Sequence, residues 1–407
     1  MMNYVTTIGE IAEIFDGPHA TPTKIDSGPF FLSISSLEKG RLDLTKSAFL
    51  SEDDFKRWTK RVTPQQGDIL FSYETRLGEA AIMPRGIRAC LGRRMGLLRP
   101  KQGKVIPEYL LYAYLSPAFQ QTIISNTIRG ATVDRIALNE LPNFEIRIPP
   151  ISEQKKLVRP LLAIDQKIEI NNKINVELEE MIKTIYDYWF VQFDFPDENG
   201  KPYKSSGGKM AWNEAIKRDI PADWTDGVLS SIAKITMGQS PPGESYNEKG
   251  NGLPFFQGCT DFGVRFPDVR QYTYMPSRIA NPGDILLSVR APVGSLNIAN
   301  EKCCIGRGLA ALKSNNGYTS YLWGILRHLA RVFERRNVDG TTFGAITKDD
   351  LFSLAVIKPS EQVLKRFQSA TKPAYEMQNK IEFENRELIA LRDWLLPMLM
   401  NGQVKVV

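Results

Sequence analysis

GDILFS at residues 67–72 returns as GDILLS at residues 283–288, and this repeated stretch decides how the whole chain is organised. Four further matches keep one order around both copies: IAEI at 11–14 with IAKI at 232–235, CLGR at 90–93 with CIGR at 304–307, GATV at 130–133 with GTTF at 340–343, and SEQ at 152–154 with SEQ at 360–362. Five matches at a period of roughly 210 residues indicate a duplicated globular unit, because solenoid repeats are only about 20–50 residues long. A duplicated protein presents two similar surfaces, so we expect it to read a target that comes in two parts.

Length and composition allow two or three domains with their own cores, since the chain has 407 residues of which 42% are hydrophobic. The formal net charge of +6 permits an anionic partner without requiring one. The N-terminus lacks a signal-peptide pattern, and no apolar run approaches the ~18 residues of a membrane span, so we expect a cytoplasmic protein without membrane contact. Four cysteines, Cys90, Cys259, Cys303 and Cys304, lack the C-x-x-C spacing of a zinc site, so we expect reduced, packed thiols.

Short alternating apolar runs broken by Gly, Pro, Asp and Asn predict strands and turns over most of residues 1–150. One helix is predicted from Pro107 to about Ile124, with a counterpart from Tyr318 to about Phe333. After Pro149-Pro150, Ser152 is the expected N-cap of a long helix that ends near Phe190.

The predicted long helix carries a heptad seam with two polar positions, Asn171 and Asn175, in its middle. Its apolar seam residues are Leu157, Leu161, Ile164, Ile168, Leu178, Ile182, Ile185 and Trp189. A rougher seam in the second copy includes Leu364, Phe367, Ile381, Leu388 and Leu395. We expect the two helices to pack on each other, with the alternative that each only caps its own domain. Pro160 and Pro373 lie inside these patterns and predict a kink or a restart of each helix.

Between the copies, WFVQFD at residues 189–194 is too aromatic for a free linker, and the polar stretch that follows is too polar for a core. A globular unit ending in IPPISEQ at 148–154, a long helix, this aromatic segment, and then a second unit and helix resemble the DNA-specificity (S) subunit of type I restriction-modification enzymes. The resemblance extends over essentially the whole chain. Each motif alone is weak, and their duplicated order is the specific signal.

The resemblance implies an α+β fold in which two mixed α/β target recognition domains are separated by two long antiparallel coiled-coil helices, related by a pseudo-twofold internal repeat. The corresponding boundaries are 1–150 for the first recognition domain, 151–195 for the central helix, 196–215 for a linker, 216–358 for the second recognition domain and 359–407 for the C-terminal helix. Each domain would read one half of a split double-stranded DNA sequence in the major groove.

The same resemblance implies a non-catalytic subunit that binds two modification subunits and, in the full complex, two restriction subunits. Adenine methylation with S-adenosylmethionine would belong to the modification subunits, and ATP with Mg²⁺ to the restriction subunits, so this chain would bind no cofactor. The residues agree, because no Gly-x-x-x-x-Gly-Lys-(Ser/Thr) loop occurs. The two histidines, His19 and His328, lie in unmatched settings, which argues against a metal cluster or a histidine triad.

Polar and basic residues in the loops shared by both copies are the predicted DNA contacts, because arginine binds guanine or phosphate bidentately and threonine contacts phosphate or bases. These residues are Tyr73, Thr75, Arg76, Arg93, Arg94, Arg129 and Thr132 in the first copy, and Gln239, Ser240, Arg290, Arg307, Thr341 and Thr342 in the second. The alternative for each is a solvated loop residue or a turn former. Two other classes of protein remain open: a coiled-coil scaffold that does not bind DNA, and a self-sufficient enzyme, which would need the missing motifs.

Overall fold

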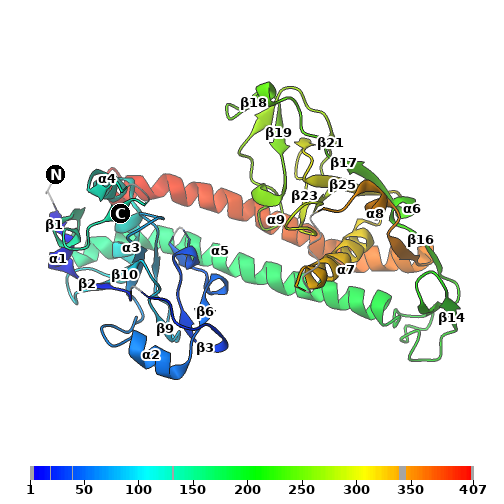
Figure 1. Ribbon diagram of the computed structural model, residues 1–407, viewed down its shortest axis with the longest axis horizontal. Helices are drawn as coiled ribbons and strands as arrows, with labels where there is room; N and C mark the ends of the chain where they lie inside the picture. Colours follow the sequence, from blue (N-terminus) through cyan, green and yellow to red (C-terminus); the bar gives the residue numbers. More distant parts are fainter. Residues whose placement is uncertain (1–3, 19, 39, 131–132, 339–344, 405–407) are drawn as a thin grey trace. The chain divides into compact units, whose positions relative to one another are not determined.

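The computed structural model describes residues 4–18, 20–38, 40–130, 133–338 and 345–404, with the side chains of 331–338 excepted (Figure 1). The chain divides into two compact units. Unit 1 comprises residues 1–169 with 387–407, and unit 2 comprises residues 170–386. Each unit therefore contains one copy of the duplicated sequence and part of both long helices.

Unit 1 is built on an antiparallel four-stranded sheet in the order β2 (Ala12–Asp16), β10 (Met95–Pro100), β7 (Ile69–Ser72), β8 (Ala80–Ile82). All four residues of β7 are buried, since the strand lies inside the sheet with side chains packed on both faces. A second sheet joins β6 (Ala48–Phe49), β3 (Ile25–Phe31) and β9 (Ala89–Cys90), and its β3–β9 pair is parallel. The smaller elements of the unit are β1 (Val5–Thr7), α1 (Ile8–Ile11), β4 (Leu37–Glu38), β5 (Arg41–Leu42), α2 (Glu52–Trp58), β11 (Thr127–Ile128), β12 (Arg135–Ile136) and β13 (Glu145–Arg147).

Two helices cover this sheet where the sequence predicted one. They are α3 (Pro107–Leu115) and α4 (Pro117–Ser125). The helix is interrupted at Ser116. The Ser116 hydroxyl accepts a hydrogen bond from the Phe119 amide at 3.4 Å, and Pro117 occupies the first turn of α4. An N-cap serine followed by proline is a start signal, so the predicted single helix was wrong at this point.

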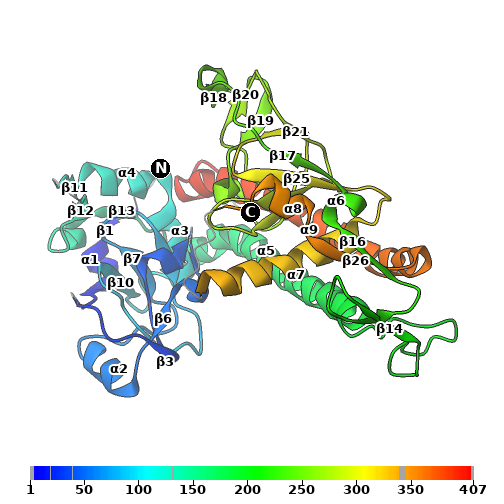
Figure 2. The same cartoon turned by 45° about the vertical axis from the view of Figure 1, so that its right-hand side comes forward.

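Unit 2 repeats the architecture with β17 (Ala233–Met237), β25 (Leu309–Ser314), β22 (Ile285–Ser288) and β23 (Leu296–Ile298). Its second sheet runs β18 (Tyr246–Asn247), β20 (Tyr272–Thr273), β19 (Leu253–Phe256), β24 (Cys303–Ile305), β21 (Ile279–Ala280), and most of these strands gather at one end of the unit (Figure 2). The β19–β24 pair is parallel, as β3–β9 is in unit 1. The remaining elements are β14 (Met210–Asn213), β15 (Arg218–Pro221), β16 (Thr225–Val228), α6 (Leu229–Ile232), α7 (Thr319–Val338), α8 (Lys348–Phe352) and β26 (Ala355–Lys358).

The repeated GDIL motif has the same structural task in both copies. The Asp68 carboxylate accepts the Gln65 amide at 2.8 Å, and Asp284 accepts the Asn281 amide at 2.8 Å. At the other end of the motif, Ser72 donates to the Glu74 carbonyl at 2.6 Å, and the equivalent Ser288 donates to a carbonyl two residues onward at 2.7 Å. The motif therefore closes the turn before the central strand and fixes the loop after it, which confirms the predicted duplication at atomic detail.

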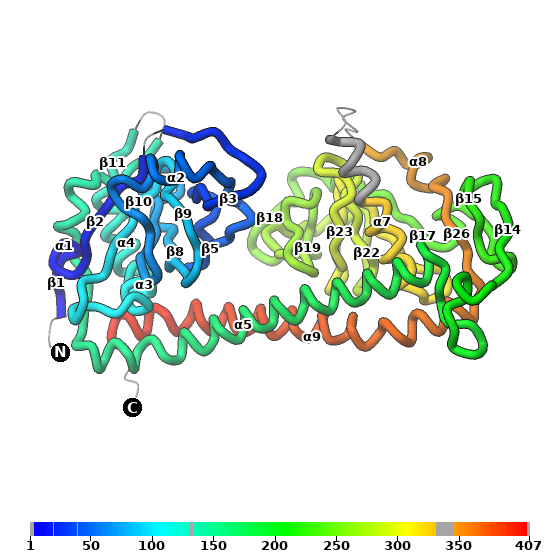
Figure 3. Tube along the Cα trace, turned by 90° about the horizontal axis from the view of Figure 1, so that it is seen from below, coloured from blue at the N-terminus to red at the C-terminus, as the bar shows by residue number. Residues whose placement is uncertain are grey.

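The long helices are α5 (Ile151–Tyr186), extended by a π-helical turn over Asp187–Val191, and α9 (Glu361–Met400). Within each unit they lie side by side and antiparallel (Figure 3). In unit 1, Arg392 of α9 pairs with Asp165 of α5 at 3.1 Å. In unit 2, Asn171 donates to Asn385 at 2.9 Å, and Gln378 donates to the Asn175 carbonyl at 3.3 Å. Higher numbers on one helix thus meet lower numbers on the other, as an antiparallel pair requires.

The predicted seam residues form the buried stripe of both helices. The buried ones are Leu157, Leu161, Ile164, Ile168, Ile182, Trp189, Phe367 and Ile381, and the partly buried ones are Leu178, Ile185, Leu364, Leu388 and Leu395. The same side chains also join the cores of the globular parts, since Leu157 and Leu161 cluster with Tyr109, and Trp189 and Phe367 with Tyr321. The two helices therefore pack on each other and also cover the globular parts.

The expected N-cap of α5 and the alternative of a restart at the two prolines were wrong. Helix α5 begins at Ile151, so Ser152 lies in its first turn rather than at the N-cap. Helices α5 and α9 continue through Pro160 and Pro373 without restarting. Buried neighbours of Pro160, such as Leu157, Val158 and Leu161, hold the helix against the core there, and tertiary packing of this kind outweighs the local preference. The polar stretch after the aromatic segment leads into the hairpin β14–β15.

Candidate nucleic-acid interface

The loops that carry the repeated motifs come together at one edge of the sheet in unit 1, here called edge 1 (residues 73–79, 92–95, 129–130 and 133–136). The Tyr73 amide donates to the Arg94 carbonyl at 3.2 Å, and the Ile136 amide donates to the Tyr73 carbonyl at 2.9 Å. Glu74 and Arg135 form an isolated β-bridge. Sequence-distant motifs thus share one surface, as a binding site requires.

Unit 2 builds the equivalent edge 2 from residues 238–240, 257–259, 289–294, 306–308 and 345–346. The Val289 amide donates to the Gly308 carbonyl at 2.9 Å, and the Ile346 amide donates to the Val289 carbonyl at 2.8 Å. The Gln239 amide donates to the Ile305 carbonyl at 3.0 Å. The register matches that of edge 1, so the duplication includes the candidate interface and not only the core.

The repeated glycines of these edges allow two backbone segments to pack closely against each other. A Cβ at Gly92 would lie 1.9 Å from the Leu32 carbonyl oxygen, and one at Gly238 would lie 2.1 Å from the Gly306 carbonyl oxygen. Only glycine tolerates such an approach of two backbones. Packing therefore accounts for these two glycines without a bound phosphate.

The predicted arginine contacts of edge 1 fall into two groups. Arg93 and Arg129 are exposed, and neither forms an ion pair with the described part of the chain. Arg76 and Arg94 are engaged within the protein: Arg76 pairs with Glu79 at 3.2 Å, and Arg94 pairs with Glu74 at 2.8 Å.

Two further candidates at edge 1 differ sharply in exposure. Thr75 is exposed and has a φ of +70°, in the left-handed region. Tyr73 is only 4% exposed, and burial raises the pKa of its phenol. The burial of Tyr73 argues against a contact with DNA.

Edge 2 presents its candidates to solvent. Arg290 and Arg307 are exposed, as is Gln239, while Ser240 is half-buried. Arg307 donates to the Ser240 hydroxyl at 3.3 Å, and that hydroxyl donates to Gln257 at 3.0 Å. The position equivalent to Arg290 in unit 1 is Glu74, since both follow the serine of the motif by two residues and form the β-bridge there.

Thr132, Thr341 and Thr342 lie outside the described residues. Sequence reasoning missed two residues that the structure brings to these edges. Arg135 is exposed in β12 beside Glu74, and Gln257 accepts from both Ser240 and the Gly308 amide. The signal for Arg135 was its position two residues after the repeated GATV segment; Gln257 lies outside all five repeated motifs.

Within the described ranges, no group of three or more His, Cys, Asp or Glu side chains is arranged to hold a metal ion. The helices described here include none that is both long and apolar enough to cross a membrane.

A family model for the type I restriction modification DNA specificity domain matches residues 4–180. A Methanocaldococcus jannaschii protein named as the MjaX specificity subunit of a type I restriction enzyme is 32% identical, and the match covers 98% of this chain and 96% of that protein. The chain belongs to the specificity (S) subunits of type I restriction-modification enzymes. The MjaIX specificity subunit of the same organism is 25% identical over 88% of this chain and 82% of its own length.

A crystal structure of the S subunit from M. genitalium has the same fold, with a TM-score of 0.57 at 16% identity over 97% of this chain and 95% of that one. Membership confirms the resemblance seen in the sequence, together with mixed α/β domains and two long packed helices. It also confirms that the chain is the DNA specificity component of its system and is itself non-catalytic.

Proposed function

We propose that this S subunit recognises a two-part sequence in double-stranded DNA, with edge 1 reading one half and edge 2 the other. The observation that carries the proposal is the convergence of the same loops in both units, each with exposed arginines: Arg93 and Arg129 at edge 1, Arg290 and Arg307 at edge 2. In this proposal residues 1–150 and 216–358 are the two recognition domains.

The chemistry of the edges suits duplex DNA. Arginine side chains bind O6 and N7 of guanine in the major groove or grip phosphate, and Gln239 offers a side chain that can pair with adenine. Thr75 and Ser240 supply hydroxyls for phosphate or bases.

The ion-paired arginines of edge 1, Arg76 and Arg94, have a different role in this proposal. The pairs Arg76–Glu79 and Arg94–Glu74 hold the loop after β7 in shape. We therefore assign Arg76 and Arg94 to positioning the loop, and the exposed Arg93 to DNA contact together with Arg129.

The long helices are the proposed assembly surface for two modification subunits. Outside the buried seam, α5 exposes Ile170, Ile174 and Met181 in unit 2, which lie on one face at helical and heptad spacing. Helix α9 exposes Leu391 and Trp394 in unit 1, with 58% of the Trp394 surface open. Large apolar side chains exposed along a helix are typical of a protein interface. S-adenosylmethionine would belong to the bound modification subunits, and ATP with Mg²⁺ to two restriction subunits in the complete enzyme.

Salt-dependent binding to duplex DNA tests the proposal. The complex of this S subunit with its modification subunits should bind DNA containing its target with an affinity that falls steeply with salt. Arg93→Ala and Arg307→Ala should each cost about 1–3 kcal/mol if the arginine reads a base, or lower the salt slope by about one if it contacts phosphate. Arg88→Ala is the matched control, because this exposed arginine, just before β9, pairs with Glu52 of α2 and is not part of edge 1.

A coiled-coil scaffold that does not bind DNA gives the opposite result. The complex would then show no salt-dependent binding to duplex DNA. Neither Arg93→Ala nor Arg307→Ala would differ from Arg88→Ala. That pattern would refute DNA reading by the edges.

A further inference from the structure

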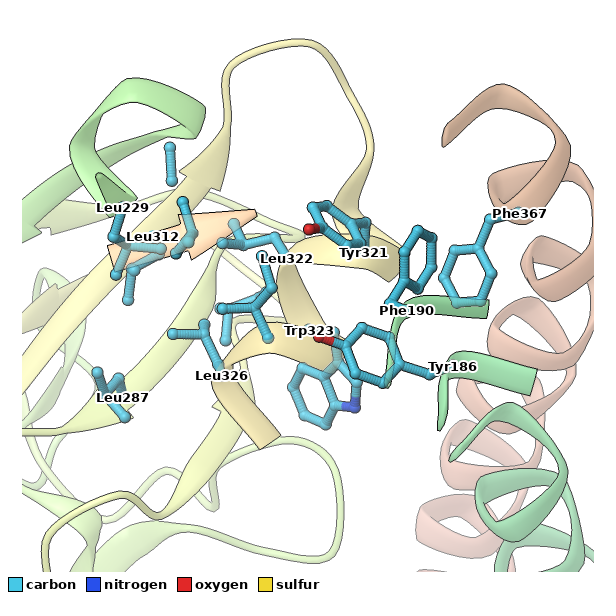
Figure 4. Packing of buried hydrophobic residues seen from close by; sticks show 14 of the residues in the cluster. Tyr186, Phe190, Leu229, Leu287, Leu312, Tyr321, Leu322, Trp323, Leu326 and Phe367 are labelled. Atoms are coloured by element: carbon cyan, nitrogen blue, oxygen red, sulfur yellow. The ribbon is translucent and has the colours of Figure 1, made fainter. Parts of the chain in front are cut away.

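The globular part of unit 2 is attached to the helix pair at an aromatic cluster, here called the aromatic anchor. It consists of Tyr186 and Phe190 at the end of α5, Tyr321 of α7, and Phe367 of α9, all buried (Figure 4). The ring of Phe190 lies 4.6 Å from that of Tyr321 and 4.8 Å from that of Phe367. Rings packed at such distances make a stable contact. The contact is concentrated near one end of the helices.

A second attachment comes from a tight turn over residues 262–267, here called the arginine turn. Phe262 and Pro267 form an isolated bridge, and the Gly263 amide donates to the Phe266 carbonyl at 3.2 Å. The sheet holds the turn from behind, since Asn297 of β23 donates to the Gly263 carbonyl at 2.9 Å. The turn is therefore a fixed part of the globular domain.

Arg265 at the tip of this turn reaches the helix pair. Only 6% of it is exposed. Its guanidinium donates to the side-chain oxygens of Gln378, at 2.9 Å, and of Asn379 on α9. Gln378 in turn donates to the Asn175 carbonyl of α5 at 3.3 Å. One side chain of the globular domain is thus connected to both helices.

The environment of Arg265 favours a directional contact over a simple ion pair. Its guanidinium lies 5.3 Å from the Tyr375 ring and 5.8 Å from the Trp323 ring, and no carboxylate of the described residues is within salt-bridge distance. Burial lowers the pKa of Arg265. A desolvated guanidinium held by amide oxygens and aromatic faces tolerates little movement, because displacement leaves a buried charge without hydrogen-bond acceptors.

Helix α9 grips the arginine turn from its own side as well. Arg386 donates to the carbonyl oxygens of Phe266 and Pro267, each at 3.1 Å. The Phe266 and Phe383 rings lie 5.0 Å apart. These contacts extend the attachment by a further two turns of the helix beyond Gln378.

The two attachments of the globular part are well separated along α9. Gln378 and Arg386 follow Phe367 of the aromatic anchor by 11 and 19 residues, which places them roughly 16 Å and 28 Å further along the helix axis at 1.5 Å per residue. Two attachments this far apart prevent rotation of the domain about the aromatic anchor.

The arginine turn is also continuous with edge 2. Gln257, whose carbonyl accepts the Gly308 amide at 3.0 Å within edge 2, precedes Arg265 by eight residues. A 3-10 turn over Cys259–Asp261 connects the two, and it is closed by a bond from the Phe262 amide to the Cys259 carbonyl at 3.1 Å. A displacement of the arginine turn would therefore be transmitted to edge 2 through a short, hydrogen-bonded segment.

We propose that Arg265 is a positioning residue that fixes edge 2 on the helix pair and thereby sets which spacer between the two half-sequences the S subunit accepts. The inference rests on the proposed function, because a spacer exists only if the target has two parts.

The test measures methylation of duplexes in which both half-sequences are constant and the spacer between them varies by single base pairs. It uses the full S subunit in complex with its modification subunits. The wild-type complex should favour one spacer. Arg265→Met should reduce that preference over spacers one base pair longer or shorter by roughly tenfold, since a hydrogen bond from a charged donor is worth about that factor or more. Both half-sequences should stay the same.

Arg278→Met is the matched control, because Arg278 is exposed and lies outside edge 2, the arginine turn and the segment that connects them. It should keep the wild-type spacer preference. If Arg265→Met does not fold, Asn379→Leu removes one acceptor of the same contact and should relax the preference in the same direction.

The outcomes separate the inference from the proposed function. A wild-type complex without a two-part target would refute the proposed function. A wild-type two-part target with an unchanged spacer preference in Asn379→Leu and, where it folds, Arg265→Met would overturn the inference alone. Lower total methylation with unchanged spacer preference would also overturn it, since it would show a purely structural role for Arg265.

Discussion

Glu382 is a buried carboxylate on α9, with 7% of its surface exposed. Burial raises its pKa from the ordinary 4.5, the nearby Asp268 raises it further, and the cations Arg386 and Arg265 lower it in part. Because the folded state binds the proton more tightly than the unfolded state, ionisation of Glu382 costs stability above the folded-state pKa. That cost is relieved as the pH falls through this pKa towards 4.5.

Glu382→Gln should therefore stabilise unit 2 at pH 8 and raise its Tm, because the neutral amide avoids the cost of a buried charge. The advantage should shrink as the pH falls through the raised pKa of Glu382, because the wild-type carboxyl takes up its proton there. Thermal unfolding of both proteins across this range is the measurement, with the exposed Glu376→Gln as control. An advantage that grew towards acid pH would contradict the sign of the effect.

At the residue scale, the sequence predicted which loops come together at the edges. It did not predict which of their arginines are exposed and which form ion pairs within the protein. Arg93 and Arg94 are neighbours in the chain, yet Arg93 is exposed and Arg94 pairs with Glu74. The difference comes from the backbone, since Arg94 has a φ of +68° and this turns its side chain towards the loop after β7. Nothing in the sequence indicates that an arginine adopts a positive φ. Arg265 escaped prediction for a related reason, because its partner Gln378 lies over a hundred residues away.

At the scale of elements, the helix seam was predictable because heptad spacing is a local property of the sequence. The spacing indicated the buried stripes of α5 and α9, including the polar positions Asn171 and Asn175. The break at Ser116 was missed although a Ser-Pro start signal was present, since the apolar spacing continued across it. The sequence left open whether the helix continues through Pro160, because tertiary packing decides it.

The two long helices also permit a test of whether their length sets the spacer. Both boundaries between the units fall inside these helices, after Glu169 in α5 and after Arg386 in α9. Four residues inserted at both points would add ~6 Å and about one turn of helix while leaving the contacts within each unit intact. Since DNA gains ~3.4 Å per base pair, the preferred spacer should lengthen by about one or two base pairs.

Methylation sequencing of the double-insertion complex decides this prediction. The single insertion after Glu169 is the control, and it should lower activity, because it shifts one seam against the other. Full activity with an unchanged spacer in the double insertion would mean that the helices do not set the distance. Altered half-sequences would mean that the helices take part in reading bases.

At the scale of the whole molecule, the duplication predicts that each recognition domain acts separately. Unit 1 has its own buried core around Phe71, Tyr109 and Tyr114, and edge 1 is built entirely from residues of the first copy. Replacing residues 1–150 with the equivalent domain of another S subunit should therefore change one half of the methylated sequence and leave the other half unchanged.

The donor domain must preserve the contacts that seat this domain on the helices. Tyr112 donates to the Asp165 carboxylate at 2.6 Å, and Arg41 pairs with the same carboxylate at 3.3 Å. Without both partners, Arg392 would be the remaining ion-pair partner of Asp165 among the described residues. A donor lacking them should therefore destabilise the hybrid, by about 1–3 kcal/mol for the lost Tyr112 bond and by about 1 kcal/mol or less for the partly exposed Arg41 pair. A donor with a tyrosine and an arginine at these positions should give a stable hybrid with one new half-sequence. A stable hybrid in which both half-sequences changed would show that the domains do not read independently, and the duplicated edges would then have to act as one site.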